Sequence, residues 1–88
     1  MKIKEGYILK NSSGNYVVVA KDGNSKLNNS IVLTETAVFL WNLIKDKHLT
    51  KTQMLNELIN NFDISTVLAL GDIDIFIRTM KENEIIEE

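Results

Sequence analysis

The stretch NNSIVLTETAVFLWNLI, residues 28–44, begins like a strand and ends like a helix. Over residues 27–33 the side chains alternate, so Ile31 and Leu33 share one face of a strand and Val32 lies on the other. Thr34 is a good N-cap, and apolar residues then recur at helical spacing. The stretch therefore predicts a strand-to-helix corner, whose helix buries Ala37, Leu40, Trp41 and Ile44.

Two more strands are expected before this corner and two more helices after it. The segments Gly6–Asn11 and Tyr16–Ala20 are rich in aromatic and β-branched residues, and the turn signals SSGN and DGNS follow them. Three strands with short loops predict an antiparallel meander. Tyr16–Ala20 is apolar on both sides, which indicates a central strand covered on both faces or one face left for a partner.

The second helix is expected over Thr50–Asn61, where Thr50 and Gln53 form a capping box. The third is expected from the Ser65 cap to Glu82, with Asn83 in the left-handed position that often ends a helix. A sheet with one apolar face must bury that face against another layer, and the three helices can form this layer. We therefore expect one α+β domain over residues 1–88, with a three-stranded antiparallel N-terminal sheet packed on a winged-helix-like three-helix bundle.

The composition excludes several functional classes. The chain has 88 residues, no cysteine and no proline, and its formal net charge is −2. Without cysteine there is no disulfide, no thiolate nucleophile and no cysteine-bound metal. Proteins that bind nucleic-acid phosphates usually carry a positive excess. No apolar run is long enough to span a membrane, and no signal peptide is recognised, so the expectation is a cytoplasmic protein.

The residues that could carry chemistry are few. His48 is the only histidine and lies among lysines between two predicted helices, where a surface loop residue is the simpler interpretation. Asp72 and Asp74 stand two apart on a helix and face different directions, so they do not form one metal site. Trp41 and Phe76 could stack on nucleic-acid bases, but they recur at the spacing of core residues on amphipathic helices, so packing is the better explanation. We expect neither an enzyme nor a bound cofactor or metal.

Two binding hypotheses remain. The second and third helices resemble a helix-turn-helix, so a winged-helix transcription regulator is one alternative. Its recognition helix would carry Asp72, Asp74 and Glu82 against Arg78 and Lys81, which disfavours DNA. The other hypothesis starts from Asn28–Val32, which carries no charge and no proline to guard a sheet edge. Such an edge invites an extended peptide to add as a strand, unless the C-terminal tail Glu84–Glu88 covers it.

The chain resembles the coenzyme PQQ synthesis protein D (PqqD-like) family over nearly its whole length. The most specific part is LTETAVFLW at residues 33–41, which is similar to the family pattern L-N-E-T-G-A-F-L-W. Thr34 stands where asparagine is usual and Ala37 where glycine is usual, and Asn83 replaces a frequent glycine.

This resemblance implies a non-catalytic module that recognises the leader segment of ribosomally made, modified precursor peptides. Such modules hold the leader as a strand antiparallel to the third strand, in a groove also walled by the third helix. They present it to a separate modifying enzyme, often of the radical S-adenosylmethionine type. The charge and composition lead us to expect no partner nucleic acid and no membrane, and a homodimer, for instance by exchange of the N-terminal strands, is a further alternative.

Mapped onto this sequence, the resemblance places the leader against the third strand and the third helix. Asp72 and Arg78 are candidates for fixing peptide charge at the rim. Leu68 and Ile75 lie off the main helical stripe. They are either an exposed apolar patch for the modifying enzyme or a second copy, or scattered surface residues without a role. The predicted peptide-binding residues are Asn29, Ser30, Ile31, Val32, Leu33, Asp72, Ile73, Phe76, Ile77 and Met80.

Overall fold

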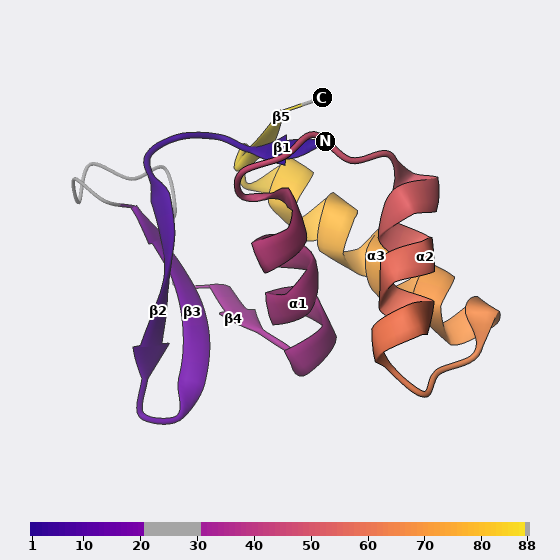
Figure 1. The fold of residues 1–88 in the computed structure, drawn as a ribbon. Helices are drawn as coiled ribbons and strands as arrows, with labels where there is room; N and C mark the ends of the chain where they lie inside the picture. The colour runs from indigo at the N-terminus through magenta and orange to yellow at the C-terminus, as the bar shows by residue number, and fades with distance from the viewer. Residues whose placement is uncertain (21–30, 88) are drawn as a thin grey trace.

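The computed structural model describes residues 1–20 and 31–87, which form a larger sheet, a small sheet and three helices (Figure 1). The larger sheet has the strand order β2-β3-β4, and the small one pairs β1 with β5. The elements are β1 Lys2–Ile3, β2 Tyr7–Ser12, β3 Asn15–Ala20, β4 Ile31–Leu33, α1 Glu35–Ile44, α2 Lys51–Asn61, α3 Thr66–Glu82 and β5 Ile86–Glu87. The predicted α+β, winged-helix-like architecture is confirmed.

The hairpin of β2 and β3 is antiparallel and closes on a two-residue turn. Ser13 and Gly14 both have positive φ angles, of 52° and 85°. Two successive residues in this region are what a type I′ hairpin turn requires. The Gly14 N–H donates to the Asn11 side-chain oxygen at 3.2 Å. The SSGN segment therefore forms the tight turn that the sequence predicts. β3 is the central strand of the sheet, as expected.

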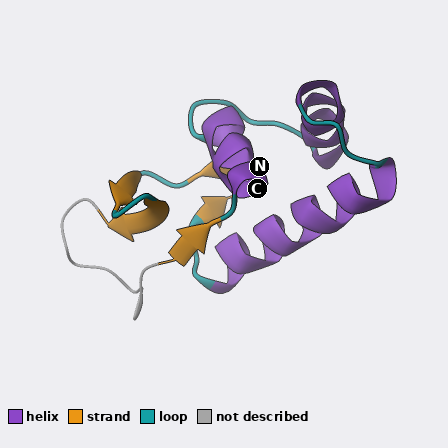
Figure 2. Cartoon of the chain, turned by 90° about the horizontal axis from the view of Figure 1, so that it is seen from below, coloured by secondary structure: helices purple, strands orange, loops and turns teal. Residues whose placement is uncertain are grey.

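The sheet has an inner face toward the helices and an outer face away from them. The register pairs Leu9 with Val18, and Val18 with Ile31, so these three side chains share one face. Val18 is fully buried, and the other two pack against the core. Ile8 and Val32 are exposed, at 40% and 61%, and their register places them on the opposite face. Figure 2 shows the strands gathered on one side of the helices.

The strand-to-helix corner forms as the sequence predicts. The Ala37 N–H donates to Thr34 Oγ1 at 3.2 Å, which caps α1 directly after β4 ends. Leu40, Trp41 and Ile44 are buried in the core that α1 shares with the sheet and α3. Because the cap and this apolar stripe are adjacent to β4, they fix the position of that strand against the helices.

The caps of the other two helices are also confirmed. Thr50 and Gln53 form the reciprocal capping box, with N···O distances of 2.9 and 3.1 Å. The Leu68 N–H donates to Ser65 Oγ at 3.3 Å, which begins α3 at the expected residue. The rings of Phe39 and Phe62 meet edge to face at 5.2 Å, so Phe39 serves packing between helices.

The end of α3 differs from the prediction by one residue. Glu84, not Asn83, has the positive φ angle, of 56°. The Ile85 N–H donates to the Met80 carbonyl and the Glu84 N–H to the Lys81 carbonyl, which is the hydrogen-bond pattern of a Schellman motif. This motif brings Ile85 onto Met80, and both are buried. The burial of Ile85 sets the register, so the left-handed position falls on the glutamate before it.

The chain after this cap returns to the N-terminus. β5 pairs with β1 in antiparallel register, Ile3 opposite Ile86, and both side chains are buried (Figure 1). From the sequence, the tail was considered only as a cover for the sheet edge, and this two-stranded sheet was not predicted. Within the part of the chain that the structure describes, no helix is long and apolar enough to cross a membrane.

Candidate peptide-binding groove

The outer edge of β4 is unpaired within residues 1–20 and 31–87. In the sheet order β2-β3-β4, β4 pairs only with β3, through Val17 opposite Val32. The C-terminal strand Ile86–Glu87 pairs with β1 instead. The sequence left open whether the C-terminal tail covers this edge. Among the described residues it does not, and the edge of β4 is free to pair with another strand.

A groove of about 150 Å³ lies between this strand, the start of α1 and the face of α3. A cavity of about this volume accommodates a group the size of benzene, so it suits one large apolar side chain. Most of its lining is apolar. The lining residues are Ile31, Val32, Leu33, Thr34, Thr36, Ala37, Asp72, Ile75, Phe76, Thr79 and Met80.

The predicted β4 residues lie at this groove as far as the structure describes them. Ile31, Val32 and Leu33 all line it, and Val32 is 61% exposed. Asn29 and Ser30 lie outside the described residues. A strand edge and an apolar cavity therefore meet in the same place, which is the arrangement that strand addition requires.

The predicted α3 residues divide into two groups. Asp72, Phe76 and Met80 line the groove. Ile73 is fully buried in the core, and Ile77 packs against the core without lining the groove. Phe76 and Met80 are themselves buried in the core, so these two residues serve both the core and the groove.

Five lining residues were not predicted to bind the peptide: Thr34, Thr36, Ala37, Ile75 and Thr79. Residues 72, 75, 76, 79 and 80 follow the spacing i, i+3, i+4, i+7, i+8, which is a single helical face. The sequence predicted three members of this face, Asp72, Phe76 and Met80, and it added Ile73 and Ile77 from the adjacent, core-facing row. The groove face is harder to recognise because it mixes apolar residues with Asp72 and Thr79.

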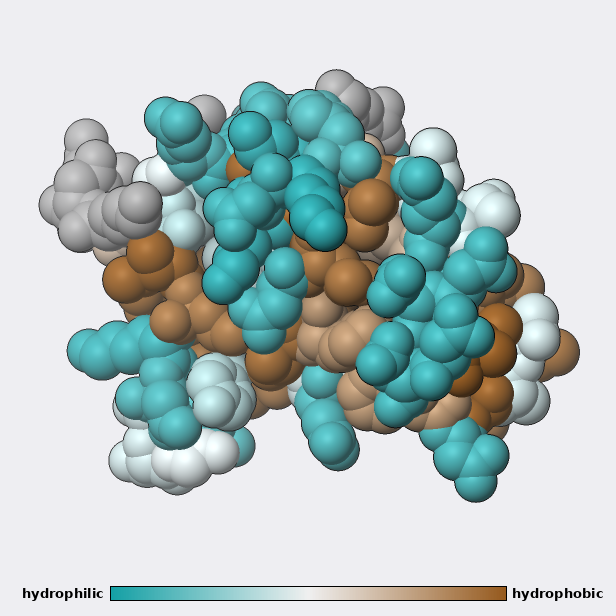
Figure 3. All heavy atoms as spheres, viewed as in Figure 1, coloured by the Kyte–Doolittle hydropathy of each residue, from teal (hydrophilic) through white to brown (hydrophobic). Residues whose placement is uncertain are grey.

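The candidate apolar patch of Leu68 and Ile75 is split by the structure. Ile75 is 55% exposed and lines the groove. Leu68 is 63% exposed and stands beside the exposed Val67 in the first turn of α3, away from the groove lining. Figure 3 shows apolar surface both over the sheet and at the end of the molecule where α3 begins.

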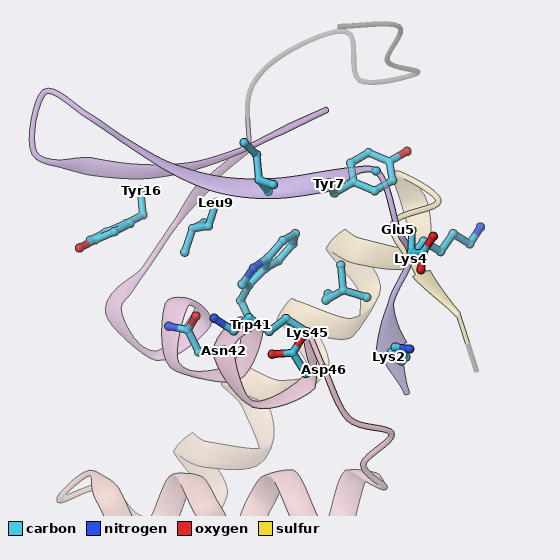
Figure 4. Close-up of a pocket in the computed structure, with 13 residues that line it drawn as sticks. Lys2, Lys4, Glu5, Tyr7, Leu9, Tyr16, Trp41, Asn42, Lys45 and Asp46 are labelled. Atoms are coloured by element: carbon cyan, nitrogen blue, oxygen red, sulfur yellow. The ribbon is translucent and has the colours of Figure 1, made fainter. Parts of the chain in front are cut away.

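A second and larger cavity, of about 1000 Å³, lies between β2 and α1 (Figure 4). Trp41 points from α1 toward β2, where Leu9 lies above it (Figure 4). The cavity also has Lys2, Lys4, Glu5, Lys45 and Asp46 on its wall. β2 is the other edge of the sheet, but its body carries Lys10, the kind of residue that guards an edge against pairing. We therefore place the candidate site at β4.

The residues considered for catalysis or metal binding do not form a centre. His48 is exposed in the connection between α1 and α2. Within residues 1–20 and 31–87 no group of histidine, aspartate or glutamate residues is placed to hold a metal ion. Asp74 forms an ion pair with Lys51, and Arg78 does not line the groove. The chemistry that this surface offers is apolar contact and main-chain hydrogen bonding.

Comparison with known proteins agrees with this geometry. A family model described as coenzyme PQQ synthesis protein D (PqqD) matches residues 5–86. The chain belongs to the PqqD family. Among curated proteins, none matches this PqqD-family sequence. One solved structure, "TbiB1 in Complex with the TbiA(beta) Leader Peptide", is similar with a TM-score of 0.71 and 15% identity, over 99% of this chain and 95% of that chain. This likeness confirms the PqqD-like fold.

Proposed function

We propose that this chain captures the leader segment of a ribosomally made precursor peptide by strand addition to β4. The observation that carries the proposal is the unpaired edge of Ile31–Leu33 beside an apolar groove. Main-chain hydrogen bonds to an edge give affinity, and pockets for alternate side chains give specificity. Membership of the PqqD family and the likeness to a protein solved with a leader peptide support the same assignment.

The rigid setting of β4 supports this proposal energetically. The capped α1 begins two residues after β4 ends, and its buried face is anchored by Leu40 and Trp41. A strand that is already ordered loses little conformational freedom when a peptide adds to it. The strand-to-helix corner is thus scaffold that holds the binding edge in place.

In this proposal the protein is not an enzyme, and it presents the bound leader to a separate modifying enzyme. In the family that the chain resembles, this enzyme is often of the radical S-adenosylmethionine type. Val67 and Leu68 are exposed and lie outside the groove lining, so they remain accessible when a peptide is bound. They are the surface we assign to that enzyme or to a second copy in a homodimer, a role that exposed apolar patches often have.

DNA binding is the weaker alternative. Asp74 and Glu82 are exposed on the surface of α3, and their negative charges repel the phosphates of DNA. Asp72 adds a third acidic residue at the groove. A gel-shift assay with random duplex DNA distinguishes the two functions, because binding by phosphate contacts weakens steeply with salt.

The direct test is isothermal titration of the purified chain with a synthetic leader from a precursor encoded beside its gene. The groove offers few of the tryptophan, tyrosine and arginine side chains that dominate tight interfaces, so we expect a Kd on the order of micromolar. Absence of binding by every leader encoded nearby would contradict the proposal.

A further inference from the structure

One charged side chain stands in the otherwise neutral groove. Among the described residues that line it, Asp72 is the only ionisable one. It is half-buried, and it makes no hydrogen bond or ion pair within residues 1–20 and 31–87. Two residues along the same helix, Asp74 is exposed and pairs with Lys51. The two carboxylates therefore differ in both burial and partner.

The cations of α3 do not neutralise Asp72. Arg78 and Lys81 do not line the groove. Position 78 is four residues after position 74, so Arg78 lies on the face of Asp74 rather than on the face of Asp72. Among the described residues, none therefore pairs with this carboxylate, which lies beside the apolar wall of Ile75 and Phe76.

A peptide that covers the groove changes the solvation of this carboxylate. Removing water from an ionised carboxylate is unfavourable unless the covering group supplies hydrogen-bond donors or a positive charge. A leader that brings only apolar side chains would leave Asp72 uncompensated. A lysine or arginine at the right position would instead form a charge-assisted hydrogen bond with it.

The spacing of that position follows from the helix and the strand. Asp72 lies one helical turn before Ile75 and Phe76, about 5 Å along the axis. Side chains on the same face of an extended peptide are about 6.6–6.8 Å apart at positions i and i+2. For a peptide that runs alongside α3, a cation at Asp72 is therefore expected two residues from the apolar side chain that fills the groove.

We propose that Asp72 selects leaders that carry a lysine or arginine two residues from an apolar anchor side chain. This inference rests on the proposed function and adds to it the chemistry of the ligand. Every peptide offers the same main-chain groups to β4, so discrimination between leaders has to come from side chains. Asp72 adds an electrostatic interaction that the apolar contacts of the groove do not provide.

The test uses a displayed library of random 20-residue peptides, sorted against the full chain and three variants. The wild-type chain is expected to enrich peptides with lysine or arginine two residues from an apolar residue. Asp72→Asn should lose this enrichment, and Asp72→Lys should replace it with aspartate or glutamate. Asp74→Asn is the matched control, with the same charge change on the same helix outside the groove, and should keep the wild-type pattern.

The contribution of the basic residue to affinity is then measured with one enriched peptide. Replacing its basic residue with glutamine should weaken binding to the wild-type chain by about fivefold to tenfold and to Asp72→Asn by less than about twofold. Circular dichroism of each variant establishes that it is folded.

The outcomes separate the two levels of the account. Enrichment of alternating apolar peptides with no fixed basic residue, or the same basic preference in Asp72→Asn, would overturn the role of Asp72 and leave peptide capture standing. A wild-type chain that enriches no peptide at all would contradict the proposed function itself.

Discussion

Val32 of β4 and Ile75 of α3 both line the groove, and each keeps more than half of its surface exposed, 61% and 55% respectively. Burial of apolar surface contributes about 25 cal/mol per Å². Two apolar side chains left in water on either side of an unpaired strand edge therefore gain free energy when a peptide covers both. This pair is the most direct structural sign that the groove is a binding surface.

The first prediction concerns Ile75. Ile75→Glu should lower the affinity for a leader peptide at least about tenfold, because the peptide would bury an unpaired carboxylate. The free energy of unfolding should change by less than about 0.5 kcal/mol, since the side chain is already exposed. Fluorescence anisotropy with a labelled leader and urea denaturation measure the two effects.

Leu68→Glu is the matched control for this substitution. Leu68 has a similar exposed fraction, 63%, on the same helix, but it does not line the groove. Its replacement should leave leader affinity unchanged. Equal losses in both variants would show that the effect comes from the net charge of α3 and not from the groove.

The second prediction separates the C-terminal tail from the groove. Ile86 is buried opposite Ile3 in the small sheet. Ile86→Ala should lower the free energy of unfolding by about 2–4 kcal/mol, the usual cost of a large-to-small core substitution. Leader affinity should stay within about twofold of the wild type where the protein is folded. Tighter binding by the variant would contradict the account, because it would mean that the tail competes for the edge.

The third prediction concerns the capping box of α2. Thr50→Ala removes the acceptor of the Gln53 N–H and should lower the free energy of unfolding by about 1 kcal/mol. Thr52→Ala, two residues into the same helix, should be neutral or slightly stabilising because alanine has the higher helix propensity. Equal destabilisation by the two changes would argue against the cap. Thermal unfolding by circular dichroism measures both.

The fourth prediction tests the cap of α3. Glu84→Gly should raise the free energy of unfolding by about 0.5–1 kcal/mol, because glycine adopts the positive φ of 56° without the penalty of a side chain. Asn83→Gly is the control and should be destabilising, since Asn83 has a negative φ and its amide donates to the Thr79 carbonyl at 2.8 Å. If only the Asn83 change stabilised the protein, the assignment of the left-handed position would be wrong.

Local signals explain why so much of the fold is predictable. The cap at Thr34, the capping box at Thr50 and the turn before Gly14 each act within a few residues, so the sequence displays them directly. The pairing of Ile3 with Ile86 was missed because it joins the two ends of the chain in strands of two residues, too short for a periodic pattern. The error at Asn83 has a tertiary cause, namely the burial of Ile85.

The candidate site is predictable to a lesser degree for a related reason. Ile31–Leu33 could be expected at a sheet edge from its uncharged strand body. Periodicity on α3 identifies the most hydrophobic face, and that face contains the buried Ile73. Ile75 lies on the neighbouring face, which only the position of β4 makes a groove. To assign binding residues on an amphipathic helix, one therefore needs to know where the neighbouring element packs against it.

The central claim is that the leader adds to β4. The most direct measurement is the set of nuclear Overhauser contacts between a bound leader peptide and the isotope-labelled protein. The account predicts cross-strand main-chain contacts to Ile31–Leu33, with peptide side chains near Ile75. Contacts to Tyr7–Ser12, the other edge of the sheet, or to neither edge, would contradict it.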